Sequence, residues 1–272
     1  MTAKVSPSGG EIAKPGDTDM AVVDLLGFDV TATTADRFAE LLLQRARSGQ
    51  GGHAVTLNME HLGRAARDPV YGGMIRSAEM ICADGAPVHW ACRMTSGSRI
   101  AQERIAGVDL VETLLQRGEG VSFGIIGGVD PKLALAKYGV SEDRIAYLNS
   151  DIIPTDPEGL SRVAKDVAAA GPQLVFIALG VPKQDIVGQA VLAELPSAVV
   201  IGIGGSFEML GGLKRRAPRL IQKLGLEWAF RFAQEPRRLF ARYCLLYPAA
   251  VWRLLLWTVF KRGASSGDAT AC

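Results

Sequence analysis

Short apolar runs alternate with stretches of helical spacing along most of this 272-residue chain, and no other feature constrains the fold as strongly. The predicted strands are residues 21–26, 53–57, 80–83, 121–126, 144–148, 174–179 and 198–203. The predicted helices are residues 34–47, 59–66, 70–77, a helix from about residue 87, 108–116, 132–138, 158–170 and 185–194. Strands that are apolar along their whole length are typical of parallel sheets with helices on both faces. The sequence therefore predicts an α/β fold with a mostly parallel sheet.

Residues that follow the predicted strands are the first candidates for function, because ligands of such sheets bind beyond the carboxyl ends of the strands. They are Thr56, Asn58, Asp84, Gly127, Gly128, Gly180, Pro182, Lys183, Gln184, Gly204 and Gly205. Paired glycines let backbone N–H groups approach a pyrophosphate. Gln184 offers an amide to a sugar hydroxyl or a phosphate and Lys183 adds charge, although an exposed turn is an equally good interpretation. The spacing G-x-G-x-x-G is absent at both glycine pairs, which disfavours a dinucleotide oxidoreductase.

Asp84 stands where a buried run meets Gly85. A carboxyl group in a partly apolar cleft has a raised pKa and is suited to act as a general base. The alternative is a turn in which the aspartate caps the backbone and the glycine takes the unusual dihedral angles. The Asp-Gly pair alone favours the turn, so the catalytic interpretation needs further support.

Positive charge is concentrated near the C-terminus. Residues 214–262 contain twelve lysines and arginines and only two acidic residues, Glu227 and Glu235, whereas the whole chain carries a net charge of +2. A basic arm on an acidic body indicates an anionic partner, either phospholipid headgroups or nucleic acid. The arm has no helix-turn-helix and no stacking platform, so nucleic acid is not expected. Its arginines are suited to bind a diphosphate, or they form a solvated basic face.

The chain divides by composition into a polar tail predicted to be disordered (1–19), an α/β core (20–225), a helical appendage (226–262) and a second tail (263–272). The apolar segment 244–260 contains Pro248 and Arg253 and is short for a membrane span, so we expect it to lie in the membrane interface. Packing on its own core or on a second copy is the alternative. No secretion signal is recognised at the N-terminus, which predicts a cytoplasmic protein.

The cysteines Cys82, Cys92, Cys244 and Cys272 are scattered, and with three histidines they show no zinc-binding spacing. Neither a metal site nor a cofactor is therefore expected. An Asp-x-Asp pair, Asp17 and Asp19, lies in the predicted tail, where no rigid frame would hold a metal ion.

Several short motifs occur together in one order along the chain. They are Thr56-Leu57-Asn58, Ala83-Asp84-Gly85, Glu103-Arg104-Ile105-Ala106-Gly107-Val108-Asp109, Ile126-Gly127-Gly128, Leu179-Gly180-Val181-Pro182-Lys183-Gln184, Gly202-Ile203-Gly204-Gly205-Ser206-Phe207, Arg216-Ala217-Pro218, Leu226-Glu227-Trp228-Ala229-Phe230-Arg231 and Glu235-Pro236-Arg237-Arg238. This ordered set resembles the WecG/TagA/CpsF glycosyltransferase family over roughly residues 22–243. The set is specific, although each motif alone is not.

The resemblance implies a Rossmann-like α/β core and an inverting transferase that moves a sugar from a UDP-sugar to a polyprenyl-diphosphate-linked acceptor. Such products feed cell-surface or extracellular polysaccharides, and the enzyme would act from the cytoplasm at the inner face of the membrane. Asp84 would be the base, with Thr56, Asn58 and Gln184 in the same pocket. The implied substrate-binding residues are Gly127, Gly128, Gly180, Pro182, Lys183, Gly204, Gly205, Arg104, Arg231, Arg237 and Arg238. The arginine-rich appendage would close over the site and contact the anionic membrane.

The sequence departs from the family pattern in places. Ser150, Asp151 and Ile152 stand where the family often has Gly-Tyr-Phe, and Glu208 stands where it usually has Asp. The apolar segment 244–260 lies beyond the pattern recognised here. A non-catalytic nucleotide-sensing module, recruited to an anionic membrane by its basic arm, is the alternative function. The transferred sugar and any homo-oligomer stay open.

Overall fold

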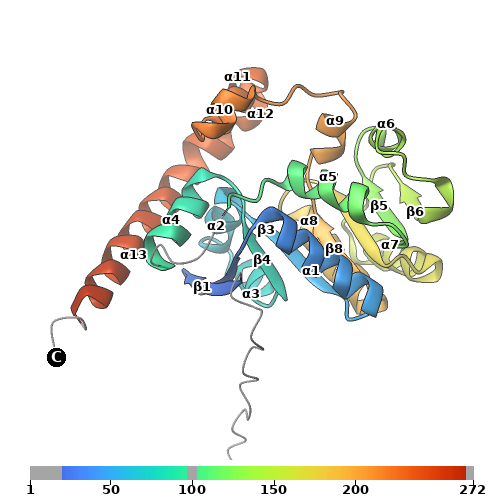
Figure 1. The fold of residues 1–272 in the computed structure, drawn as a ribbon, viewed down its shortest axis with the longest axis horizontal. Coiled ribbons are helices and arrows are strands. Elements are labelled where there is room, and N and C mark those ends of the chain that lie inside the picture. Colours follow the sequence, from blue (N-terminus) through green and yellow to red (C-terminus); the bar gives the residue numbers. More distant parts are fainter. Residues whose placement is uncertain (1–19, 97–102, 268–272) are drawn as a thin grey trace, which may run out of the picture.

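The computed structural model describes residues 20–96 and 103–267, and it confirms the α/β fold. Six parallel strands form the central sheet in the order β4-β3-β8-β7-β5-β6 (Figure 1). Their bounds are β3 Gly52–Leu57, β4 Met80–Ala83, β5 Phe123–Gly127, β6 Ile145–Asn149, β7 Leu174–Ala178 and β8 Val199–Gly202. Each was expected within a few residues. The predicted tail 1–19 lies outside the described residues.

Helices cover both faces of the sheet, and each face has its own apolar core. One core joins the sheet to helices α1 (Ala35–Ser48), α5 (Gly107–Arg117), α6 (Pro131–Lys137) and α9 (Ser206–Leu210). Another joins it to α7 (Pro157–Ala170) and α8 (Lys183–Glu194). These layers hold the strand ends, and therefore the residues that follow them, in fixed positions.

The N-terminal part of the fold differs from the prediction. The expected strand 21–26 is the first half of an antiparallel hairpin, β1 (Ala21–Leu25) and β2 (Phe28–Ala32), which forms a separate two-stranded sheet. Leu26 and Gly27 both have positive φ, and the Asp24 carboxylate accepts a hydrogen bond from Gly27 N at 2.8 Å. A two-residue turn with positive φ at both positions suits the twist of a hairpin. The hairpin packs with α2 (Met59–Ala65), α3 (Pro69–Arg76) and α4 (Ala86–Ser96) in a third apolar cluster.

The C-terminal appendage consists of α11 (Glu227–Gln234), α12 (Pro236–Phe240), a π-helical segment Ala241–Leu246 and α13 (Tyr247–Gly267). The short helix α10 (Arg219–Lys223) precedes it. Pro248 interrupts the apolar run in the sequence, but it does not interrupt the helix. Tyr247 N donates to the carbonyl of Arg242, five residues back, so the helix widens just before the residue that has no N–H to offer. Helix α13 continues to Gly267, past the predicted start of the tail at residue 263.

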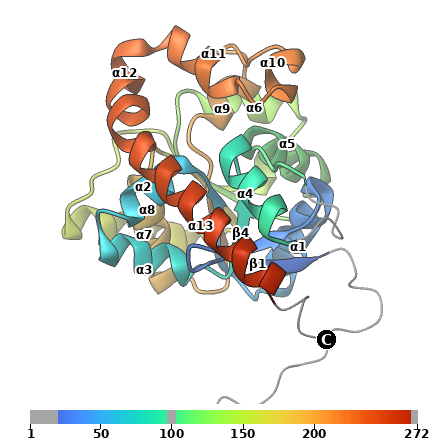
Figure 2. The same cartoon turned by 90° about the vertical axis from the view of Figure 1, so that its left-hand side faces the viewer.

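Within the described residues, one helical stretch, Pro236–Phe260, is long and apolar enough to cross a membrane, with a mean hydropathy of 1.4. One side of α13 is nevertheless packed on the core. Ala250 and Leu254 belong to the same apolar cluster as Val88 and Leu62, from α4 and α2. Figure 2 shows α13 crossing the face of the molecule that these helices and β1 form. Segment 244–260 therefore combines a side packed on the core with an exposed side.

Candidate active site

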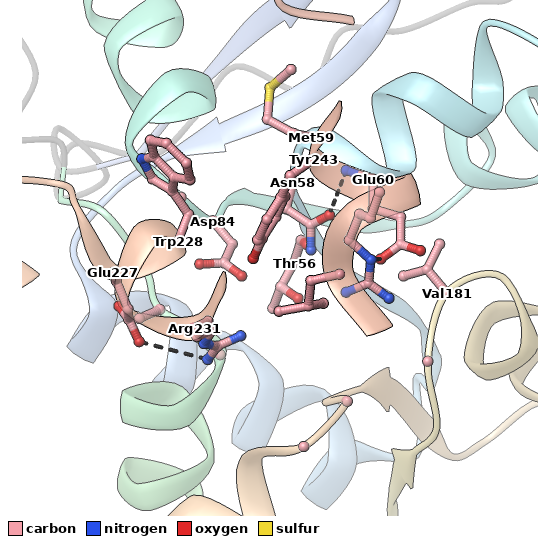
Figure 3. A pocket seen from close by; sticks show the side chains of 18 of the residues that line it. Thr56, Asn58, Met59, Glu60, Asp84, Val181, Glu227, Trp228, Arg231 and Tyr243 are labelled. Carbon is pink, nitrogen blue, oxygen red and sulfur yellow. Dashed lines mark hydrogen bonds and ion pairs between the residues drawn. The ribbon is translucent and has the colours of Figure 1, made fainter. Parts of the chain in front are cut away.

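A cavity of about 770 Å³ lies at the carboxyl edge of the sheet. The residues at the ends of β3, β4, β7 and β8 form one wall, which we call the sheet wall. Residues of α11, α12, the π-helical segment and α13 form the opposite wall, which we call the appendage wall. Figure 3 shows side chains from both walls directed into the same space. The cavity thus lies where ligands of parallel α/β sheets are expected.

Asp84 enters the cavity from the end of β4. Its backbone N–H donates to the carbonyl of Leu57 at 2.9 Å, and Gly85 takes a positive φ of 82° that turns the chain into α4. The side chain is half-buried and points toward the space between Arg231 and Tyr243 (Figure 3). Burial raises its pKa to about 6, Arg231 opposes that rise, and Glu227 adds to it. The carboxyl is therefore mostly ionised at neutral pH and able to accept a proton.

Asn58 has a structural task beside its place in the cavity. Its side-chain oxygen accepts hydrogen bonds from Glu60 N at 3.0 Å and His61 N at 3.4 Å, which caps α2. In return His61 Nδ1 accepts from Asn58 N at 3.3 Å. The amide nitrogen donates a long hydrogen bond to the carbonyl of Thr56, at 3.4 Å. Asn58 therefore offers a donor, rather than an acceptor, to anything bound in the cavity.

Gln184 lies at the start of α8 and is almost fully buried, at 4% exposure. It packs against the backbone of Gly202, where an added Cβ would come within 2.4 Å of its amide nitrogen. Only glycine at position 202 leaves room for this side chain. The close fit fixes where the Gln184 amide meets the cavity.

Directly behind these residues, four buried polar side chains form what we call the buried carboxylate cluster: Asp185, Tyr71, His61 and His53. Tyr71 OH donates to Asp185 Oδ2 at 2.7 Å, and Nε2 of each histidine lies 3.7 Å from an Asp185 oxygen. Burial pushes the pKa of Asp185 upward, but His61, Tyr71 and His53 together hold it below its usual value. Because His61 Nδ1 accepts from Asn58 N, its proton in the neutral ring is on Nε2, facing Asp185.

The buried carboxylate cluster joins two parts of the sheet wall. Asp185 follows Gln184 on α8, and His61 is the capping partner of Asn58 on α2. The contact between them sets the distance between two cavity residues from different strand ends. Sequence reasoning missed this cluster, since Asp185 is far along the chain from the other three members. The one hint was a polar residue, His53, in an otherwise apolar run.

Glu227 organises the cations at one end of the appendage wall. Its carboxylate lies 3.5 Å from Arg104, 3.6 Å from Arg231 and 3.9 Å from Arg216. Arg216 also binds Asp109, with NH2 2.7 Å from Oδ2. Guanidinium groups from three segments thus converge on Glu227, and two of them, Arg104 and Arg231, also lower the pKa of Asp84. Sequence analysis noted Glu227 as one of two acids in a basic region and as part of the motif 226–231, but assigned it no role.

A second group of ion pairs holds the appendage further along. Arg242 Nε lies 3.0 Å from Oε2 of Glu60, which is buried at 4% exposure on α2. Glu235 contacts both Arg238 at 2.6 Å and Lys214 at 3.4 Å. Arg238 and Arg242 line the cavity. Arg237 is outside the lining, whereas Arg242, which was not among the predicted site residues, is part of it.

The cavity brings together most, though not all, of the predicted site residues. Those that line it are Asp84, Thr56, Asn58, Gln184, Gly180, Gly204, Gly205, Arg104, Arg231 and Arg238. Those outside its lining are Gly127, Gly128, Pro182, Lys183 and Arg237. The strand order explains the first two, because β5 lies beyond β7, where a Cβ on Gly128 would meet Ala178 rather than open space. Lys183 is exposed on α8. Asp17 and Asp19 lie outside the described residues.

Glu208 is a cavity residue that the sequence marked only as a departure. It lies on α9, is 8% exposed, and its Oε2 has no hydrogen-bond partner among the residues that the structure describes. A buried carboxylate oxygen without a hydrogen-bond partner is costly. Such an oxygen in a cavity wall therefore indicates that a bound ligand donates a hydrogen bond to it.

A parallel α/β sheet with a cationic cavity at its carboxyl edge is suited to bind a phosphorylated ligand. The sequence matches the Glycosyl transferase WecG/TagA/CpsF family over residues 23–264, and the chain belongs to that family. It is therefore a glycosyltransferase of cell-surface polysaccharide synthesis, with a nucleotide-sugar donor and a lipid-linked acceptor. The match extends through the apolar segment 244–260, which is thus part of the family pattern, contrary to the expectation from the motifs alone.

Proposed function

We propose that this enzyme transfers a sugar from a UDP-sugar, with inversion at the anomeric carbon, to an acceptor linked to polyprenyl diphosphate, and that Asp84 is the general base. The observation that carries the proposal is the Asp84 carboxyl itself. Its pKa is raised to about 6, and it faces a cavity lined with guanidinium groups. A base with this pKa is mostly ionised near pH 7 yet still binds a proton well.

The reaction is a single displacement. Asp84 accepts the proton of the acceptor hydroxyl while that oxygen bonds to the anomeric carbon of the donor. The bond from the anomeric carbon to the diphosphate oxygen breaks, and its electron pair leaves with UDP. Arg104 and Arg231 lie beside Asp84 and are placed to stabilise the negative charge that develops on the diphosphate.

The donor is proposed to lie over the ends of β7 and β8. Gly180, Gly204 and Gly205 expose backbone to the cavity, so N–H groups can approach phosphate oxygens closely. The unpartnered oxygen of Glu208 would accept from a nucleoside hydroxyl or N–H. Gln184 and the Asn58 amide would donate to the transferred sugar.

Cationic side chains would supply the charge that a metal ion supplies in other sugar transferases. Arg104, Arg231, Arg238, Arg242 and Lys214 all line the cavity. On this basis we propose a metal-independent transfer, for which a chelator should leave the rate unchanged and added magnesium or manganese should not raise it.

The exposed side of the appendage is proposed to rest on the anionic inner face of the cell membrane. Trp252 and Phe260 are exposed on α13, and Arg253 lies between them. Basic and aromatic side chains on an apolar helix suit the headgroup region of a bilayer. Binding to vesicles that contain anionic lipid should weaken as salt is raised.

The direct test is UDP release from a panel of UDP-sugars in the presence of a sugar linked to a lipid diphosphate. We expect continuous release of UDP with one donor. The anomeric carbon in the product should have the configuration opposite to that in the donor. Release limited to one equivalent, or none with any donor, would favour a nucleotide-sensing module instead. Retention of configuration would contradict the single displacement.

A further inference from the structure

Helix α13 carries two apolar stripes on different sides. Ala250, Leu254 and Thr258, spaced four residues apart, are 2–4% exposed and face the core. Tyr247, Val251, Trp252 and Leu255 also follow helical spacing, and all four line the cavity that contains Asp84. A helix that is apolar on both sides requires an apolar partner for its second side.

In this second stripe Tyr247 and Val251 are partly buried against the same apolar cluster as the first stripe, and the other two residues are exposed. Trp252 is 63% exposed and Leu255 is 53% exposed, although both border the cavity. The exposed apolar surface continues along the helix through Leu256, Val259 and Phe260. From Tyr247 to Phe260 this track is about 20 Å long at the usual rise per residue. An open apolar track of this kind on a protein surface marks a binding site.

The two ends of this track differ in charge. At the cavity end stand Arg238 and Arg242. Pro87 and Trp228, which is 49% exposed, also line the cavity. The outer end consists of Leu256, Val259 and Phe260. A ligand that matches both ends is an amphiphile with an anionic head and a long apolar chain.

We propose that the part of this track that borders the cavity, from Tyr247 to Leu255, binds the first isoprene units of the acceptor's lipid chain, with the diphosphate beside Arg238 and Arg242. The outer part, from Leu256 to Phe260, would only lead the rest of the chain toward the bilayer. The inference rests on the proposed acceptor and assigns a site to its lipid part. Continuity with the cavity carries it, because Trp252 and Leu255 line the cavity and exposed apolar side chains continue from them along α13. The acceptor sugar then points toward Asp84, and the remaining chain passes from the end of the helix into the bilayer.

The test compares acceptors that differ only in chain length, in detergent without a bilayer. The three acceptors share the sugar diphosphate that supports UDP release, and they carry an isopentenyl, a farnesyl or an undecaprenyl chain. For the native enzyme, KM should fall by about tenfold or more from the shortest chain to farnesyl, since each buried methylene favours binding. The double variant Trp252→Gln with Leu255→Gln should lose most of that chain-length dependence. Its KM for the farnesyl acceptor should rise several-fold more than its KM for the isopentenyl acceptor.

The matched control is Val259→Gln with Phe260→Gln, which alters equally exposed residues of the same helix outside the cavity lining. We expect it to weaken vesicle binding as much as the first pair does, and to retain the step in KM from isopentenyl to farnesyl. Equal chain-length dependence in the native enzyme and both double variants would overturn the lipid site and leave α13 as a membrane contact only. Failure of the proposed function looks different, since the native enzyme would then transfer to none of the acceptors.

Discussion

The two walls of the cavity are held in place in different ways. In the sheet wall, Asn58 and Gln184 are fixed by backbone hydrogen bonds, close packing and the buried carboxylate cluster. In the appendage wall, Arg231 and Arg238 are 46% and 62% exposed in their side chains and are held by ion pairs. Exposed ion pairs contribute little to stability, whereas buried polar networks are costly to break.

This difference indicates that the two walls have different roles in the reaction. The sheet wall is preorganised and positions the donor and Asp84, as a reacting centre requires. The appendage wall supplies positive charge from side chains that can rearrange at small cost, which suits a surface that must admit a bulky lipid-linked acceptor. Substitutions in the sheet wall should therefore change stability strongly, and those in the appendage wall should change mainly the rate.

The largest effect is expected for Asp84→Asn, which keeps the shape and removes the base. Transfer should fall by about 100-fold or more. Because the pKa of Asp84 is raised from 3.8 to about 6 by burial, the ionised carboxylate costs stability, and this cost grows between those two pH values and is full above them. The variant should thus be more stable than the native enzyme at pH 8, by up to about 3 kcal/mol, and equally stable near pH 3. Single-turnover rates and urea unfolding at both pH values measure this. Near-native turnover would remove Asp84 from its assigned role.

Next in size is Asp185→Asn in the buried carboxylate cluster. The amide can still accept from Tyr71, but it removes the negative charge that faces Nε2 of both histidines at 3.7 Å, so the free energy of unfolding should fall by about 3 kcal/mol. Because the pKa of Asp185 is held below its usual value, the difference should be present at pH 7 and shrink only below about pH 4. Asp166→Asn, on the exposed side of α7, is the control and should change stability by less than about 0.5 kcal/mol. A stability loss no larger than that of the control would show that the sheet wall does not depend on this cluster.

Arg231→Gln should lower the transfer rate much more than it lowers stability. Stability should change by less than about 0.5 kcal/mol because the side chain is exposed, while kcat/KM should fall by about tenfold or more. Since Arg231 lowers the pKa of Asp84, its loss should also move the acidic limb of the rate profile to higher pH. Arg237→Gln, on the same appendage but outside the cavity lining, should do neither. Equal rate losses in both variants would mean that general positive charge, and not a cavity contact, is what matters.

The smallest effect is expected for Glu235→Gln. Its partners Lys214 and Arg238 are both more than a third exposed, so thermal unfolding should show a stability change of less than about 0.5 kcal/mol. The rate should fall only a few-fold, since Arg238 keeps its place on α12 without the ion pair. A stability loss comparable with that of Asp185→Asn would erase the distinction between the two walls.

The sequence predicted the local structure of the core well, because its strands are continuously apolar and each is closed by glycine or a polar residue. It missed the hairpin, whose strands each carry an aspartate, and it did not predict the π-helical segment before Pro248, because such a turn has no signature of its own. Strand order is a long-range property, so Gly127 and Gly128 were grouped with strand ends that lie two strands or more away in the sheet, at β8 and β3.

The candidate site was predictable in part for the same reason. Asp84, Asn58 and Gln184 directly follow or flank strands, and family motifs mark them. Neither Glu60 nor Arg242 carries such a mark, and their pairing joins positions that are remote in the chain. Contacts of this kind follow from how α13 packs on the core, which no local pattern encodes.

The dependence of kcat/KM on pH tests the central claim most directly, since it reports the ionisation of groups in the free enzyme. The native enzyme should show a plateau above about pH 7 and a tenfold loss per unit on the acidic side of a pKa of about 6, the value that burial gives Asp84. The residual activity of Asp84→Asn should show no such limb. A native profile that stays flat down to pH 5, or a limb near 6 that persists in the variant, would contradict the assignment of Asp84 as the base.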